Sequence, residues 1–238
     1  MLEGTSIRGM RTMGIEPCRT GGLVALLTWL SPAFPTGGFA YSHGLEWAVE
    51  AGDVGDEAGL LGWLEDVLRH GAGRADGVLL RQAYRAADLA GLMAVAELGA
   101  AVQPCRERRA EAVGQGDAFA IAAEVWGAPL LAALRAAGGA IVYPVAVGAL
   151  ARAHGVAEDA AALGFLQAFA ANLVSAAVRL VPLGQTAGLR VLAALEGVMR
   201  EVAEETRAAT LDDLGGACFR SDIAAMRHET QYTRLFRT

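Results

Sequence analysis

The sequence predicts an all-α protein: a single-domain helical bundle of about ten helices with flexible N- and C-terminal tails. Hydrophobic residues make up 54% of the 238 residues but aromatic residues only 6%, so alanine and leucine supply most of the apolar surface. Both residues favour helices. Apolar side chains also recur at helical spacing, as at Leu60, Leu64, Val67 and Leu68. We expect the domain to span 23–221.

The first predicted element is a short apolar helix over 23–30, and a helix breaker follows it. Pro32 and Pro35 fix φ and remove two backbone donors, so no helix continues through them. Gly37 and Gly38 allow a close or left-handed turn. Residues 1–22 show no such organisation, and we expect them to form a flexible tail.

Helices follow the breaker as far as residue 123. Gly52 and Pro104 are placed to end helices. Asp56 and Asp76 each precede an apolar stripe and are placed to cap a helix. The last segment, Arg106–Ala123, is charged at first and apolar later. This pattern is typical of a solvated helix start with ion pairs between neighbouring turns.

The C-terminal half contains a predicted helix hairpin over Asn172–Leu189. Its first arm must end near Val181, because Pro182 cannot continue a helix and disfavours α backbone in the residue before it. Gly184 relaxes the turn, and Gln185 begins the second arm. The chain then runs to a segment over 222–238 that is rich in arginine and aromatic residues.

One stretch has to be tested as a membrane span. Ala160–Val178 carries no charge and is long enough to cross a bilayer. It contains Gln167, Asn172 and Ser175, however, and much of it is alanine, so a buried helix is favoured. The beginning of the sequence shows no signal peptide.

Composition excludes several classes of function. All 20 basic residues are arginine, so the chain lacks the lysine of a nucleotide-binding P-loop and of a Schiff base. The net charge of −6 argues against nucleic acid as the main partner. The three cysteines are odd in number and far apart, which indicates reduced thiols and a cytoplasmic location.

No catalytic or metal-binding motif is present. The sequence lacks a GxSxG elbow and an HExxH pair, and its four histidines are scattered. His43 and Cys218 have no local partner, which argues against a metal site at either residue. We therefore predict no catalytic residues, no stable metal site and no resident cofactor.

Three motifs resemble a known family. They are SPAFPTGGFAYSHGLEWAVEAGD at 31–53, NLVSAAVRLVPLGQTAGL at 172–189 and DIAAMRHETQYTRLFRT at 222–238. Together they resemble the UreF family of urease accessory proteins, and the likeness extends over nearly all of the chain after residue 22. The match is not complete, since His43 and Leu189 stand where the family often has glutamine.

The resemblance implies a cytoplasmic, non-catalytic chaperone of urease maturation. Such a chain would form a homodimer, bind UreD (UreH in some organisms), recruit the GTPase UreG and help deliver nickel to apo-urease. Nickel would be handled transiently by the complex, and GTP would be bound by the partner. Neither nucleic acid nor a membrane would be bound. An unrecognised helical enzyme and a membrane-associated helical protein are the alternatives.

The resemblance also assigns roles to residues. Glu46 and Arg179 match positions implied to face the GTPase. The 222–238 segment is implied to be a docking tail for UreD/UreH, with contacts from Arg227, His228, Glu229, Tyr232, Arg234 and Phe236. A tail folded against its own domain is the other interpretation of this segment.

Overall fold

The computed structural model describes residues 21–238. This part of the chain is helical throughout and has no β-strand. Its α-helices are α1 Gly21–Trp29, α2 Leu45–Glu50, α3 Glu57–His70, α4 Ala72–Arg85, α5 Leu89–Ala101, α6 Arg106–Ala122, α7 Pro129–Ala136, α8 Tyr143–Ala153, α9 Glu158–Leu180, α10 Gln185–Ala194, α11 Glu196–Glu205 and α12 Phe219–His228. Three 3₁₀ turns join them: η1 Gly38–Ala40, η2 Ala123–Trp126 and η3 Leu211–Asp213. The all-α prediction is confirmed, and the predicted tail over 1–22 lies almost wholly outside the described residues.

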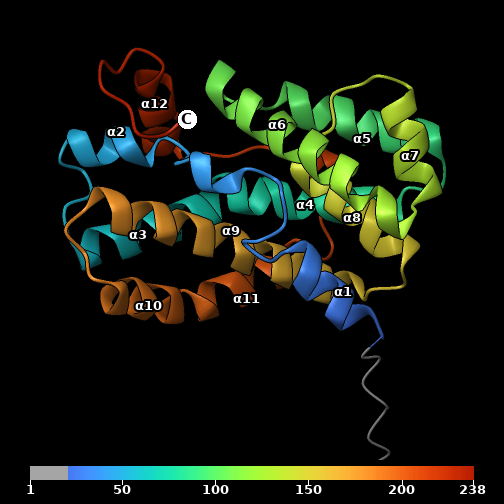
Figure 1. Ribbon diagram of the computed structural model, residues 1–238, viewed down its shortest axis with the longest axis horizontal. Coiled ribbons are helices and arrows are strands. Elements are labelled where there is room, and N and C mark those ends of the chain that lie inside the picture. Colours follow the sequence, from blue (N-terminus) through green and yellow to red (C-terminus); the bar gives the residue numbers. More distant parts are fainter. Residues whose placement is uncertain (1–20) are drawn as a thin grey trace, which may run out of the picture.

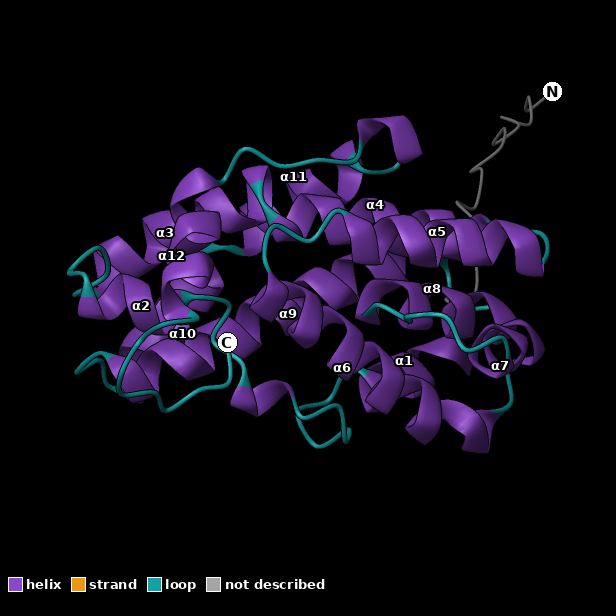
Figure 2. Ribbon diagram, turned by 90° about the horizontal axis from the view of Figure 1, so that it is seen from above, coloured by secondary structure: helices purple, strands orange, loops and turns teal. Residues whose placement is uncertain are grey.

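Helix α9 runs through the middle of the bundle and joins two clusters of buried side chains (Figure 1). Its N-terminal half, with Phe165, packs into a cluster that includes residues of α4, α6 and α8. Its C-terminal half, with Leu173, packs with α2, α3, α10 and α11. From above, α2, α3 and α12 gather at one end of the molecule and α1 and α7 at the other (Figure 2).

Several helix ends form for the reasons that the sequence gives. The Asp56 carboxylate accepts a hydrogen bond of 2.8 Å from the Gly59 amide and caps α3. Helix α9 ends at Leu180, just before Pro182, and α10 begins at Gln185 after Gly184. The segment from Pro32 to Gly38 also has the predicted form. Helix α1 ends before the two prolines, Gly37 takes a left-handed φ of 73°, and Gly38 is the first residue of η1.

The predicted start of α4 is wrong. Asp76 does not cap this helix but lies in its second turn, because α4 begins at Ala72 directly after Gly71. Gly71 ends α3 and starts α4 without a side-chain cap. The turn is this tight because Gly73 lacks a side chain: a Cβ there would lie 2.7 Å from the Cα of Leu68. The charge-free stretch of α9 passes the composition test for a membrane span, but half of that stretch is buried in the bundle.

A glycine at the α6–α8 contact gives the first testable prediction. A Cβ at Gly116 would lie 2.0 Å from the carbonyl oxygen of Ile141. Gly116→Ala should therefore lower the free energy of unfolding by about 3 kcal/mol or more through the backbone shift that it forces. Gly62→Ala in α3 is the matched control, because no atom lies near a Cβ there and the change should stabilise the helix by about 0.5–1 kcal/mol. Urea denaturation of both variants checks the pair, and equal effects would contradict the prediction.

Candidate functional site

The chain after α12, residues 229–238, is here termed the C-terminal segment. It packs against the domain, with the side chains of Phe236 and Thr238 buried. Asp222–His228 belong to α12, which begins at Phe219. The expectation of a flexible tail over 222–238 is therefore corrected: inward-facing groups along this stretch find partners on α2, α6 and α9.

Glu46 of α2 is the main anchor of the C-terminal segment. Its buried carboxylate accepts hydrogen bonds from the backbone amides of Leu235 (2.7 Å) and Phe236 (2.9 Å). The same carboxylate lies 3.1 Å from Nε2 of His228, which is fully buried. One side chain thus accepts from two backbone donors of the C-terminal segment and contacts the His228 ring, and buried amides would be costly to leave unpaired away from water.

The first turn of α6 holds the segment from the other side. Glu107 lies 2.6 Å from Nδ1 of His228 and accepts a 2.7 Å hydrogen bond from Arg234. In return, the Glu229 carboxylate accepts from the backbone amides of Arg106 (3.1 Å) and Glu107 (3.4 Å). A carboxylate at this place caps the positive end of the α6 dipole. The C-terminal segment and the start of α6 therefore stabilise each other.

The last residues contact η1 and the interior. The carbonyl oxygen of Thr238 accepts from the Ser42 amide (2.8 Å) and hydroxyl (2.5 Å). The Thr238 hydroxyl donates to the buried Glu111 carboxylate (2.8 Å), which also pairs with Arg108 and contacts His43. Burial opposes ionisation of Glu111, but Arg108 and His43 outweigh it and lower its pKa to about 2. Burial and the nearby Arg108 lower the pKa of His43 to about 4.

Arg179 of α9 covers the segment from outside. Its guanidinium lies 4.4 Å from the centre of the Phe236 ring and donates a 2.9 Å hydrogen bond to the carbonyl oxygen of Phe39. A cation over an aromatic face is attractive, and more so when partly desolvated. Arg179 therefore ties α9, η1 and the C-terminal segment together.

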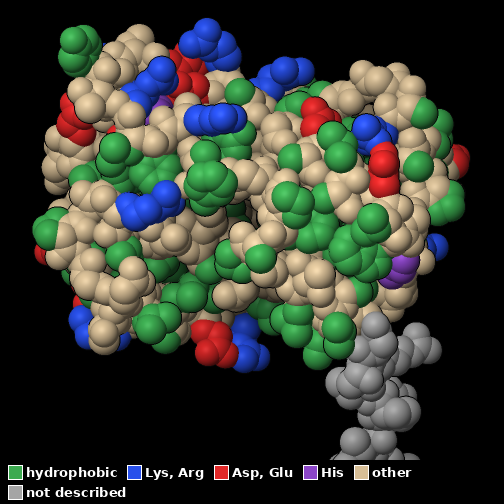
Figure 3. Space-filling model, in the orientation of Figure 1, with side chains coloured by type: hydrophobic (Ala, Val, Ile, Leu, Met, Phe, Trp, Pro, Cys, Tyr) green, Lys and Arg blue, Asp and Glu red, His purple; other side chains and the backbone are tan. Residues whose placement is uncertain are grey.

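The outer surface of this region is apolar and basic. Tyr232 is fully exposed, and so is most of Leu235. On α12 the exposed side chains Phe219, Ile223 and Met226 form a helical stripe, while the opposite face is buried. Several arginine side chains (blue) gather over α12 and the C-terminus in Figure 3. The region thus combines a fixed inner side with an apolar and cationic outer side.

Comparison with known proteins shows which family this chain belongs to. The UreF family pattern matches residues 54–196. A urease accessory protein UreF of Rhodopseudomonas palustris (strain BisA53) is 57% identical over 221 residues, covering 91% of this chain and 93% of the relative. The UreF of Bradyrhizobium sp. (strain BTAi1) is 53% identical over 220 residues, covering 91% and 92%. The chain belongs to the UreF family. Membership in a family of urease accessory proteins confirms that this UreF chain is not an enzyme.

The structure brings together the two residue sets that the sequence kept apart. Glu46 and Arg179, assigned to the GTPase side, both contact the C-terminal segment, assigned to UreD/UreH. Glu46 is buried beneath that segment, whereas Arg179 is exposed. Of the tail residues, His228 and Phe236 face inward, whereas Arg227 and Tyr232 face solvent. At the rim, Arg234 pairs with Glu107 and Glu229 pairs with Arg106.

Sequence reasoning missed Ser42, Glu107 and Glu111. The charged start of α6 was interpreted as a solvated helix surface, but Glu107, Arg108 and Glu111 are buried there. The sequence does contain a sign of this burial. Glu107 and Glu111 are four residues apart and so share one side of the helix, whereas Arg109 lies on the other. In residues 21–238, no group of three or more histidine, cysteine or acidic side chains is placed to hold a metal ion.

Asp76 gives this UreF chain a testable pH dependence. Its carboxyl lines two cavities of about 240 and 210 Å³, and burial raises its pKa from 3.8 to about 7 despite the nearby Arg108. The folded protein therefore keeps a proton that the unfolded chain releases near pH 4, so this group makes folding less favourable as the pH rises from 4 to 7. Asp76→Asn should remove that slope, at most about 1.4 kcal/mol per pH unit. Unfolding free energies measured between pH 4.5 and 8 check this, and parallel profiles for the two proteins would contradict it.

Proposed function

We propose that this UreF chain is the scaffold that joins UreD/UreH to the GTPase UreG in the complex that inserts nickel into apo-urease. One observation carries the proposal: residues from α2, α6, α9 and the C-terminal segment converge on one ordered surface. Glu46, Glu107 and Arg179 fix the shape of that surface, and Tyr232 and Leu235 project from it. Exposed aromatic and large apolar side chains on a rigid support are typical of binding surfaces.

The two partners are proposed to use neighbouring parts of this surface. UreD/UreH binds the α12 stripe of Phe219, Ile223 and Met226 together with Tyr232, because an exposed apolar helix face suits a stable partner. The GTPase binds around Arg179. In this scheme the chain itself works in the cytoplasm, has no resident cofactor and hands nickel on only transiently, while GTP is bound by the partner.

Co-purification tests the scaffold. The chain is expressed with the UreD and UreG of its own organism and recovered through a tag that precedes residue 21. Recovery of both partners is expected, with UreD/UreH lost in a Phe219→Glu, Ile223→Glu variant. A Leu189→Glu variant is the matched control, since Leu189 is an exposed leucine on α10. A folded chain that recovers neither partner would refute the proposal.

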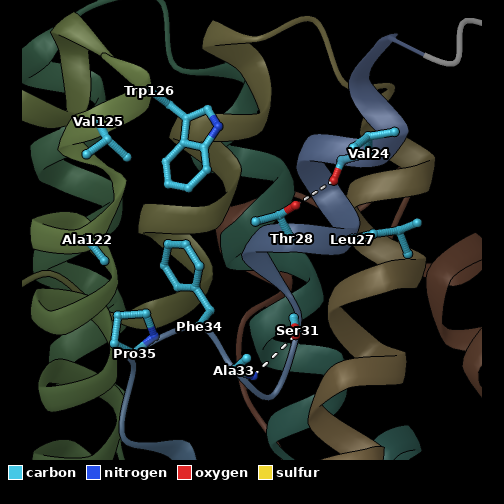
Figure 4. Close-up of a pocket in the computed structure, with 10 residues that line it drawn as sticks. All are labelled: Val24, Leu27, Thr28, Ser31, Ala33, Phe34, Pro35, Ala122, Val125 and Trp126. Atoms are coloured by element: carbon cyan, nitrogen blue, oxygen red, sulfur yellow. Dashed lines mark hydrogen bonds between the residues drawn. The ribbon is translucent and has the colours of Figure 1, made fainter.

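A homodimer is part of the proposal and has a surface of its own. An apolar groove of about 740 Å³ lies between α1 and the end of α6, away from the C-terminal segment (Figures 1 and 4). Its lining residues are uncharged: Val24, Leu27, Thr28, Ser31, Ala33, Phe34, Pro35, Ala122, Val125 and Trp126. Figure 4 shows the rings of Phe34 and Trp126 at the base of the groove, between α1 and Val125.

Helix α1 supports the proposal that a second copy occupies this groove. It carries no charged residue and is apolar on all sides, which is typical of a buried helix, yet Val24 and Leu27 are exposed. A two-fold axis would place the α1 ridge of each copy in the groove of the other. Leu27→Glu should convert the dimer to a monomer in analytical ultracentrifugation, while Leu189→Glu should leave it unchanged. A dimeric Leu27→Glu variant would refute this interface.

A further inference from the structure

A polar cavity of about 210 Å³ lies between α4, the first turn of α6 and the start of α12. Asp76 of α4 lines it, and so do Ser221 and Asp222 of α12. Two carboxyl groups that are far apart in the sequence therefore share one cavity. Because α12 supplies part of the lining, this helix also forms part of the cover of Asp76.

One guanidinium serves all the carboxyl groups around Asp76. In residues 21–238, the titratable or charged groups that line its two cavities, besides Asp76 itself, are Arg108, Glu111, His43, Tyr143 and Asp222. Arg108 already donates a 2.5 Å hydrogen bond to Glu111. His43 is neutral at ordinary pH, because its pKa is lowered to about 4, and burial raises the pKa of Tyr143. The two aspartates thus lack a cation of their own.

Both aspartates favour the protonated form while the cavity is closed. Burial raises the pKa of Asp76 to about 7 and also raises the pKa of Asp222, in each case against the attraction of Arg108. Contact with bulk water would return each carboxyl to an ordinary pKa near 4. Opening of the cavity would therefore release protons. It becomes easier as the pH rises from about 4 to about 7 and changes little above that range.

Helix α12 is attached differently at its two ends. At its C-terminal end, His228 is buried between carboxylates of α2 and α6. The chain enters its start through Gly215, whose φ is 141°, and Gly216, and both glycines line the cavity. Beside them, the Ala217 amide donates a 2.7 Å hydrogen bond to the His70 carbonyl. A glycine pair at this place suits a hinge at which the start of α12 lifts while its end stays fixed.

We propose that Asp76 and Asp222 form a pH-sensitive latch for α12. While both carboxyls are protonated, α12 stays closed over the cavity. Once they ionise, the start of α12 lifts more readily and admits water to them. The latch does not depend on which partner binds this chain. It does affect the outer stripe of Phe219, Ile223 and Met226, because these side chains move with α12.

Hydrogen exchange of residues 222–228 between pH 5 and 8 tests the latch. After correction for the pH dependence of the intrinsic exchange rate, the opening constant of these amides should rise about tenfold or more between pH 5 and 7 and level off near pH 8. The double variant Asp76→Asn, Asp222→Asn should remove the rise, because an amide has the shape of a protonated carboxyl and does not ionise. Helix α9 should stay protected over the same labelling time.

Asp212→Asn is the matched control, since Asp212 is an exposed aspartate in η3. It should show the same rise as the unmodified chain. Equal protection of α12 at pH 5 and 7 in the unmodified chain would overturn the inference, and so would a rise that persists in the double variant. A pH effect on the free energy of unfolding without one on residues 222–228 would also overturn it, because Asp76 would then titrate without moving α12.

Discussion

Replacement of Glu46 by alanine is expected to release the C-terminal segment and to abolish recruitment of the proposed partners. The change leaves the amides of Leu235 and Phe236 without their acceptor and His228 with only one of its two carboxylates. Loss of these charge-assisted hydrogen bonds should lower the free energy of unfolding by about 2–4 kcal/mol. Hydrogen exchange of residues 229–238 should rise by orders of magnitude while α3 and α9 stay protected.

Glu50→Ala is the control for this experiment. Glu50 lies one turn further along α2 and is exposed, and its carboxylate accepts one hydrogen bond from Gln231 of the same segment. Its loss should cost less than about 1 kcal/mol and leave the segment protected. If Glu46→Ala left exchange in 229–238 unchanged, Glu46 would not be the anchor that the contacts indicate. If exchange rose but both partners still bound, the ordered segment would not be needed for binding.

Replacement of Arg81 by alanine should be the most damaging change away from this surface. The Arg81 side chain is almost wholly buried and joins α4 to α9 and α11. It donates to Glu158 (2.7 Å), to the Ala203 carbonyl (2.7 Å) and to the Thr206 hydroxyl (3.3 Å). Truncation to alanine leaves these acceptors without a donor and creates a cavity. We therefore expect a loss of about 3–5 kcal/mol in the free energy of unfolding.

Arg200→Ala removes an arginine of the opposite kind. Its ion pair with Glu196 is exposed and lies within α11, and such pairs contribute about 0–1 kcal/mol. Urea denaturation of the two variants measures the difference directly. A similar small loss in both would mean that Arg81 is replaced by water or by a neighbouring side chain without cost. Neither change touches the proposed partner surface, so the remaining folded Arg81→Ala protein should still bind UreD.

The helix ends and turns that the sequence predicted best are those that depend on residues adjacent in the chain. The Asp56 cap, the end of α9 before Pro182 and the turn through Gly37 each follow from the chemistry of a few adjacent positions. The start of α4 was missed because no capping side chain marks it. There the constraint is the close approach of Gly73 to Leu68, which only the packed turn reveals.

The site was predictable only in part, because its partners are distant in sequence. Family resemblance singled out Glu46 and the residues near His228, but not the bond between them, which joins residues 182 positions apart. Glu107 has the local pattern of a surface helix residue, but it is buried and contacts His228 of α12. The same contact explains why the expected free tail is folded. Whether the predicted partner contacts occur stays a prediction for the binding experiments above.

The bond between Ser42 and Thr238 has a consequence for synthesis of the chain. These residues are 196 positions apart, so the ribosome makes the second of them on the order of 10–40 s after the first. Throughout that interval Glu46 lacks the amides of Leu235 and Phe236, and Glu107 lacks Arg234. The surface that is proposed to receive the partners can therefore form only after residues 229–238 have been made, which would keep chains that lack them from recruiting those partners.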